Sequence, residues 1–185
     1  MDDPQWLDPC EARAWRGWLA VSELLRAQIA RDLWRDSGLS DADFGVLVFL
    51  SEHPEPRVRM TDLANALRWS KSRLSHQVGR MERRGLIRRE ECPSDARGSF
   101  AVLTAAGVVE LERAAPSHVS SVRRNFIDLL SEDHLTVLSE INEMMIDHLL
   151  ALPGAPAPPV ACQGGRAASD PGGPTGGMRP MRAAT

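Results

Sequence analysis

The sequence predicts a mainly α-helical fold with a small β-wing, in which a winged helix-turn-helix lobe lies between N-terminal and C-terminal helices. Two helical patterns meet at a brief turn at residues 68–69, and the second pattern ends at Gly85. Two short strand patterns follow directly, which is the order expected of a wing. The long helical patterns on either side carry more apolar residues than one neighbouring helix could cover.

Charge is distributed unevenly along the 185 residues. Residues 57–97 hold 11 Lys and Arg against 5 Asp and Glu, although the whole chain has a net charge of −3. A basic segment on an acidic body predicts that nucleic acid would bind at one face. The chain has neither an apolar run of membrane-spanning length nor a signal-peptide pattern, so we expect a cytoplasmic protein without a membrane partner.

The residues that usually carry enzyme chemistry are few and scattered. Cys10, Cys92 and Cys162 are odd in number and share no metal-ligand spacing, so we predict neither a disulfide framework nor a metal site. The sequence contains no nucleophile–base pair or phosphate-binding loop, and its five histidines are dispersed. We therefore expect a protein that is not an enzyme and needs no cofactor.

A first long helix is predicted from residue 8 to about residue 35. Asp8 suits the N-cap position, Pro9 the first helical position, and Glu11 the acidic position of a capping box. Gly38 can end the helix in the left-handed conformation. Apolar side chains cover so much of its circumference that contact with a second chain is expected.

Two shorter helices are predicted next, over residues 40–52 and 61–67. The first carries a buried apolar pattern and stops before Pro54 and Pro56, which cannot continue a helix. A short extended piece at residues 58–60 leads into the second. This second helix is the first half of the predicted helix-turn-helix.

The helix from Ser70 to Gly85 is the predicted recognition helix. Leu74, Val78 and Met81 form one apolar stripe, which leaves a polar and basic face outward. Side chains that can reach base edges in a major groove are Ser72, Arg73, His76 and Gln77. Side chains that suit phosphate contacts are Ser70, Lys71, Arg80 and Arg84. The alternative interpretation is a helix face that only contacts solvent.

The wing is predicted from strands at residues 86–91 and 100–103, joined by a loop at residues 92–99. Asp95 can hold the Arg97 guanidinium in place, and an ordered arginine at a wing tip suits a narrow minor groove. The alternative is a surface ion pair that contributes little to stability.

Two further helices and a tail complete the prediction. One helix begins at Thr104 and continues, with a bend at Pro116, to residue 130, and Ser131 caps a last helix that ends near residue 152. The remaining segment, residues 153–185, contains 7 Pro and 7 Gly without periodicity. This composition is typical of a disordered tail.

The chain resembles the multiple antibiotic resistance regulator (MarR) family over roughly residues 8–152. The resemblance rests on Thr61-Asp62-Leu63-Ala64, on Arg83-Arg84-Gly85-Leu86-Ile87-Arg88-Arg89, on Asp95-Ala96-Arg97-Gly98 and on Leu103-Thr104-Ala105-Ala106-Gly107. It implies a homodimer formed by residues 1–36 and 104–152, with residues 37–103 as the DNA-binding lobe. It further implies a transcriptional regulator that represses a palindromic operator in double-stranded DNA.

The resemblance also implies a small-molecule effector, which in such regulators is often an aromatic anion. Candidate pocket residues are Trp15, Arg16, Trp18 and His118, although an aromatic stripe at helical spacing is more often core. Cys10 suggests a thiol-based redox sensor as an alternative, but the chain has no tyrosine to hold such a cysteine, and Cys92 is expected to be exposed beside the wing. A winged-helix module for protein–protein interaction is the remaining alternative.

Overall fold

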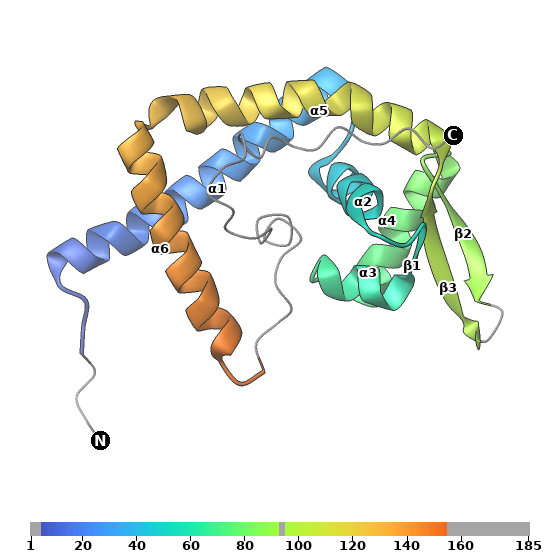
Figure 1. Ribbon diagram of the computed structural model, residues 1–185, viewed down its shortest axis with the longest axis horizontal. Helices are drawn as coiled ribbons and strands as arrows, with labels where there is room; N and C mark the ends of the chain where they lie inside the picture. The colour runs from blue at the N-terminus through green and yellow to red at the C-terminus, as the bar shows by residue number, and fades with distance from the viewer. Residues whose placement is uncertain (1–4, 93–94, 155–185) are drawn as a thin grey trace, which may run out of the picture. The chain divides into compact units, whose positions relative to one another are not determined.

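The computed structural model describes residues 5–92 and 95–154, and the side chains of residues 95–97 lie outside this description. Helices dominate, with one small sheet, as the sequence predicts (Figure 1). In chain order the elements are α1 (Pro9–Ser37), α2 (Asp41–Glu52), β1 (Arg57–Arg59), α3 (Met60–Ala66), α4 (Lys71–Arg83), β2 (Ile87–Cys92), β3 (Asp95–Leu103), α5 (Ala105–Asn125), the 3₁₀ helix η1 (Ile127–Leu129) and α6 (Glu132–Ala151). In the part of the chain described, no helix is both long and apolar enough to span a bilayer.

The described residues form two compact units. The helical unit combines residues 5–41 with residues 112–140, and the winged-helix unit consists of residues 42–111 together with residues 141–154. The predicted dimerisation segments stay predictions. The tail predicted at residues 153–185 lies, from residue 155 onward, outside the described residues.

The ends of α1 confirm the local signals in the sequence. Asp8 accepts hydrogen bonds from the backbone N–H groups of Cys10 and Glu11, and the Glu11 side chain accepts one from the Asp8 N–H, which completes the capping box. At the other end Gly38 adopts a left-handed conformation with φ of 68°. The helix therefore ends at Ser37, two residues beyond the predicted position.

A buried carboxylate joins α1 to α5 within the helical unit. The Asp32 side chain is only 2% exposed, and its Oδ2 accepts hydrogen bonds from Ser121 Oγ at 2.7 Å and from Arg124 Nη2 at 2.8 Å. Gln28 donates to the other carboxylate oxygen at 3.0 Å. These bonds, led by that from Ser121, lower the pKa of Asp32 from 3.8 to about 2.

The core of the winged-helix unit is built from apolar side chains that the helical and strand periodicities predict. It includes residues that are at most 1% exposed, namely Val46, Leu47, Leu63, Leu74, Val78, Met81, Ile87 and Ala101. Ser70 caps α4 by accepting a hydrogen bond from the Arg73 N–H at 3.2 Å. Gly85 follows α4 with φ of 72°, as predicted for a helix stop.

The sheet has three antiparallel strands in the order β1-β3-β2. Phe100 lies opposite Arg59 on one side and Glu90 on the other. The prediction that β3 begins at Phe100 is wrong, because the strand begins at Asp95 and the pairing continues to Cys92 with an irregularity beside Glu91. Most of the loop predicted at residues 92–99 is therefore paired as part of the β-hairpin. The extended piece before α3 becomes β1, whose pairing with β3 the sequence did not indicate.

The helix that begins after Thr104 ends earlier than predicted. It continues through Pro116 but stops at Asn125, and the 3₁₀ helix η1 follows in place of the last predicted turn. Ser131 accepts a hydrogen bond from the His134 N–H at 3.2 Å, which confirms it as the cap of α6. Both α1 and α6 expose large apolar side chains in the single chain, including Val21, Leu24, Val137, Met144 and Leu149.

Candidate nucleic-acid interface

Helix α4 has a buried apolar inner face and an exposed outer face that is polar and basic. Its inner residues Leu74, Val78 and Met81 are at most 1% exposed. Four of the residues predicted to meet DNA bases or phosphates, Ser72, Arg73, His76 and Arg80, are exposed on the outer side. Ser70 and Lys71 are exposed at the N-terminal end of the helix. The helix thus offers several hydrogen-bond donors from one rigid element.

Gln77 is not on this outer face. Its side chain is 2% exposed, and its Nε2 donates a hydrogen bond of 2.6 Å to Oδ1 of the buried Asp43 on α2. Its Oε1 in turn accepts a hydrogen bond from Arg80 Nη2. The physical reason is that a buried carboxylate requires donors, and Gln77 supplies one from the facing helix. Gln77 therefore supports the interface from inside.

Asp43 also holds Arg84, one of the predicted phosphate ligands. Arg84 Nη1 lies 3.0 Å from Asp43 Oδ2, while the arginine side chain remains 42% exposed. Sequence reasoning missed Asp43, because an acid in the first turn of α2 has an ordinary role there as a helix-start residue. Only the tertiary contact shows that it fixes two residues of the recognition helix.

A second pair that sequence reasoning missed stands at the start of α4. The guanidinium carbon of Arg73 lies 4.5 Å from the centroid of the Trp69 ring, within the range of a cation–π contact. Trp69 belongs to the turn before Ser70, and Arg73 is the fourth residue after it. The i, i+4 spacing was the available signal.

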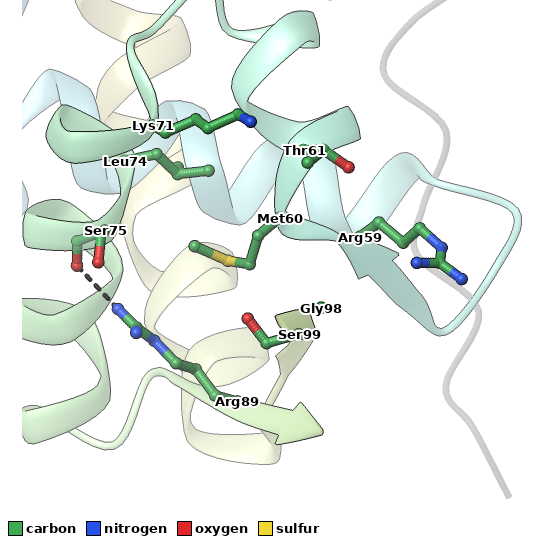
Figure 2. Close-up of a pocket in the computed structure, with 9 residues that line it drawn as sticks. All are labelled: Arg59, Met60, Thr61, Lys71, Leu74, Ser75, Arg89, Gly98 and Ser99. Atoms are coloured by element: carbon green, nitrogen blue, oxygen red, sulfur yellow. Dashed lines mark hydrogen bonds between the residues drawn. The ribbon is translucent and has the colours of Figure 1, made fainter. Parts of the chain in front are cut away.

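A pocket of about 450 Å³ opens beside α4 (Figure 2). It lies among the end of β1, the start of α3, the first turns of α4, and strands β2 and β3. Its lining residues are Arg59, Met60, Thr61, Lys71, Leu74, Ser75, Arg89, Gly98 and Ser99. Figure 2 shows Arg89 directed toward Ser75, whose carbonyl oxygen accepts a hydrogen bond of 2.8 Å from Arg89 Nη2. With three basic and no acidic side chains in its lining, the pocket has the charge required for a phosphate.

The sheet adds further basic groups to this unit. The guanidinium carbons of Arg57 and Arg59 lie 4.9 and 5.2 Å from the ring centroid of Phe100. Arg57 also approaches Glu90 at 4.0 Å. The predicted wing-tip pair, Asp95 and Arg97, belongs to β3 by its backbone, but both side chains lie outside the described residues.

The predicted effector residues belong to the helical unit. Trp15 and Trp18 on α1 are 53% and 45% exposed in the single chain. Arg16 is exposed on the same helix, and burial lowers the pKa of His118, which lies on α5. None of the four lines the pocket of Figure 2.

The two described cysteines differ from each other. Cys10 is exposed in the first turn of α1, and its sulfur lies 3.9 Å from Arg13 Nη2. Cys92 is 5% exposed, so the expected exposure beside the wing is wrong. It ends β2 and pairs through its backbone with Asp95. Among residues 5–92 and 95–154, no group of His, Cys, Asp and Glu has an arrangement that could hold a metal ion.

Similarity to known proteins agrees with this geometry. A family model described as MarR family matches residues 37–98. AbsC, a MarR family transcriptional regulator from Streptomyces coelicolor, is 48% identical, with a TM-score of 0.72 and coverage of 80% of this chain and 100% of AbsC. Sco3205, a MarR family transcriptional regulator from the same organism solved in complex with DNA, is 42% identical, with a TM-score of 0.73 and coverage of 80% and 93%.

A relative from Escherichia coli O111:H-, the transcriptional regulator HosA, is 33% identical over 93 residues, which is 50% of this chain and 68% of HosA. The match with AbsC extends over the whole of that protein. The chain belongs to the MarR family of transcriptional regulators.

Proposed function

We propose that the protein is a homodimeric repressor that binds a palindromic operator and is released from it by a small-molecule effector. The observation that carries the DNA-binding part is the exposed face of α4, on which Ser72, Arg73 and His76 stand above a buried apolar stripe. Each of these side chains can form hydrogen bonds with base edges in a major groove. The complex of Sco3205 with DNA supports this role for a relative that is 42% identical.

Phosphate contacts are assigned to residues around the base-reading group. Ser70 and Lys71 lie at the N-terminal end of α4, where the helix dipole favours an anion. Arg80 and Arg84 are exposed, and each donates a hydrogen bond to a buried side chain. Arg80 donates to Gln77, and Arg84 donates to Asp43. In the wing, we assign Arg97, with Asp95 as its holder, to the flanking minor groove, on the strength of the sequence motif and its family resemblance.

The dimer is supported by the apolar side chains of α1 and α6. Leu24 and Met144 are 69% and 65% exposed in the single chain, and they belong to a larger set that a soluble monomer rarely leaves in water. A second copy, related to the first by a two-fold axis, would cover these side chains with the same surface of its own. Such a dimer predicts half-sites one helical turn apart, about 34–36 Å.

The effector is proposed to bind in the helical unit near Trp15, Arg16, Trp18 and His118. Two exposed indoles and an exposed guanidinium suit an aromatic anion. A ligand can release DNA only if it binds more tightly to a dimer whose recognition helices have a different spacing. Repression then follows from the position of the operator at a promoter.

Selection of bound fragments from random duplex DNA tests the proposal most directly. We expect enrichment of a palindrome with half-sites one turn apart. A steep fall of affinity with salt would distinguish DNA binding from a protein-interaction role, because phosphate contacts release counterions. Absence of any enriched sequence would overturn the proposal.

A further inference from the structure

The turn between α3 and α4 fixes the position of Trp69. After α3, the Arg68 N–H donates to Asn65 O at 3.1 Å and the Trp69 N–H donates to Ala64 O at 2.9 Å. These two bonds form a Schellman motif, in which the residue after the C-cap is left-handed. Arg68 occupies that position with φ of 55°, although glycine is the usual residue there. The backbone of Trp69 is therefore set by helix α3.

The start of α4 then brings Arg73 over the indole. Ser70 caps the helix through the Arg73 N–H, so the backbone of Arg73 is fixed within the first turn. Trp69 directly precedes the cap, a position from which an apolar side chain commonly packs on the first turn of the helix. The guanidinium carbon of Arg73 consequently lies 4.5 Å from the centroid of the Trp69 ring.

This way of holding an arginine differs from that of Arg80 on α4 and of Arg84, the C-cap residue of the helix. Arg80 donates to Gln77, and Arg84 is paired with Asp43, so both use N–H donors on protein partners. Stacking on a ring restrains the guanidinium through its face and uses none of its five N–H donors. Arg73 is thus restrained and still able to donate to a ligand.

We propose that Trp69 is a positioning residue that determines the base specificity of Arg73. This proposal rests on the proposed role of Arg73 in reading bases. Two parallel hydrogen bonds to guanine O6 and N7 require one orientation of the guanidinium plane. A guanidinium without the ring samples many orientations and can donate to phosphates and other acceptors instead. Loss of the ring should therefore reduce the discrimination between guanine and other bases more than it reduces the overall affinity for DNA.

The test uses the selected operator with 7-deazaguanine placed at each guanine in turn, because this base lacks the N7 acceptor. For the natural protein, we expect this replacement at one guanine of each half-site to lower the affinity for the operator about tenfold. This is the usual contribution of one good base contact. Arg73→Ala should abolish this sensitivity. Trp69→Leu should shrink it to about threefold or less, whereas Trp69→Phe, which keeps a ring, should restore most of it.

Two controls separate this effect from damage to the fold. Trp6→Leu removes an indole that is 82% exposed and remote in sequence from the turn, and the sensitivity should stay at its natural value. Trp69→Met provides a second variant without a ring, with a flexible side chain that fills space, in case Trp69→Leu does not fold. Circular dichroism and thermal unfolding establish that each variant used is folded.

The outcomes distinguish the two proposals. If Arg73→Ala abolishes the sensitivity but folded variants without the ring at residue 69 keep it in full, the role of Trp69 is overturned and that of Arg73 stands. If no guanine shows the sensitivity in the natural protein, or if Arg73→Ala retains it, base reading by Arg73 is overturned and the role of Trp69 falls with it.

Discussion

Gln77 on α4 and Asp43 on α2 are joined by a hydrogen bond of 2.6 Å between Nε2 and Oδ1, and both side chains are buried. The contact connects the recognition helix to the helix behind it through a pair of polar groups in an otherwise apolar core. The same carboxylate holds Arg84, and the same amide holds Arg80. Two outward-facing arginines therefore depend on one buried pair.

Gln77→Leu should destabilise the protein. The substitution leaves Asp43 without one of its donors inside the core, so we expect a loss of about 1–3 kcal/mol in the free energy of unfolding, measured by urea denaturation. DNA affinity should fall by a similar factor for the operator and for its single-base variants, because no base contact is removed. Ser72→Ala is the matched control on the exposed face and should change stability by less than about 0.5 kcal/mol. A stable Gln77→Leu protein would contradict this assignment.

Gly79, inside the recognition helix, and Gly107, near the start of α5, should respond in opposite directions to substitution by alanine. A Cβ at Gly107 would lie 2.1 Å from Leu86 O and 2.8 Å from Leu103 Cδ1, so Gly107→Ala should cost about 1–3 kcal/mol in the free energy of unfolding. At Gly79, inside α4, the nearest atom is 3.7 Å away, on Arg89. Gly79→Ala should therefore stabilise the protein by about 0.5–1 kcal/mol, since alanine is the better helix former. Equal thermal shifts for the two variants would refute the close approach at Gly107.

Asp32 should make stability depend on pH in the acidic range. Its pKa is lowered from 3.8 to about 2 in the folded protein, so its charged form stabilises the fold above pH 3.8, and this contribution is lost as the pH falls toward 2. Asp32→Asn lacks the titrating group. The natural protein and the Asp32→Asn variant should differ most in free energy of unfolding near neutral pH, as measured by urea denaturation. This difference should shrink below pH 3.8. A difference that stays constant down to pH 2 would rule out this linkage.

Arg97→Ala should weaken operator binding without unfolding the protein. We expect a loss of at least about tenfold in affinity, corresponding to about 1.4 kcal/mol, in gel-shift measurements at fixed salt. The loss should be greatest for operators with A·T-rich flanks, whose narrow minor groove attracts an arginine. Arg13→Ala, which removes an exposed arginine from α1 instead, is the charge-matched control. Unchanged affinity of Arg97→Ala would remove the wing tip from the mechanism.

Features that depend on nearby residues could be predicted from the sequence. The capping box at Asp8, the left-handed Gly38 and Gly85, and the Ser70 cap all follow from contacts within one turn of a helix. The apolar stripe of α4 likewise follows from its periodicity. Local chemistry therefore defined most helix boundaries and the fold class.

Features that depend on distant residues could not be predicted in this way. Gln77 lies at the edge of the apolar stripe, and only Asp43, on another helix, determines that it points inward. The pairing of β1 with β3 also depends on residues far apart in the sequence. Register and side-chain orientation at such places are decided by tertiary contacts rather than by propensity.

Strand β1 has three residues, and helix α3 begins at the next one, Met60. Because β1 pairs with β3 through its whole length, the wing is fastened to the first helix of the helix-turn-helix. The wing and the recognition helix should therefore approach a duplex as one rigid body. If the wing and α4 bind the two grooves as proposed, a change in minor-groove width at the flank of an operator would also shift α4 relative to major-groove base pairs that were not altered. Affinity would then depend on the distance between the grooves as well as on the bases in them.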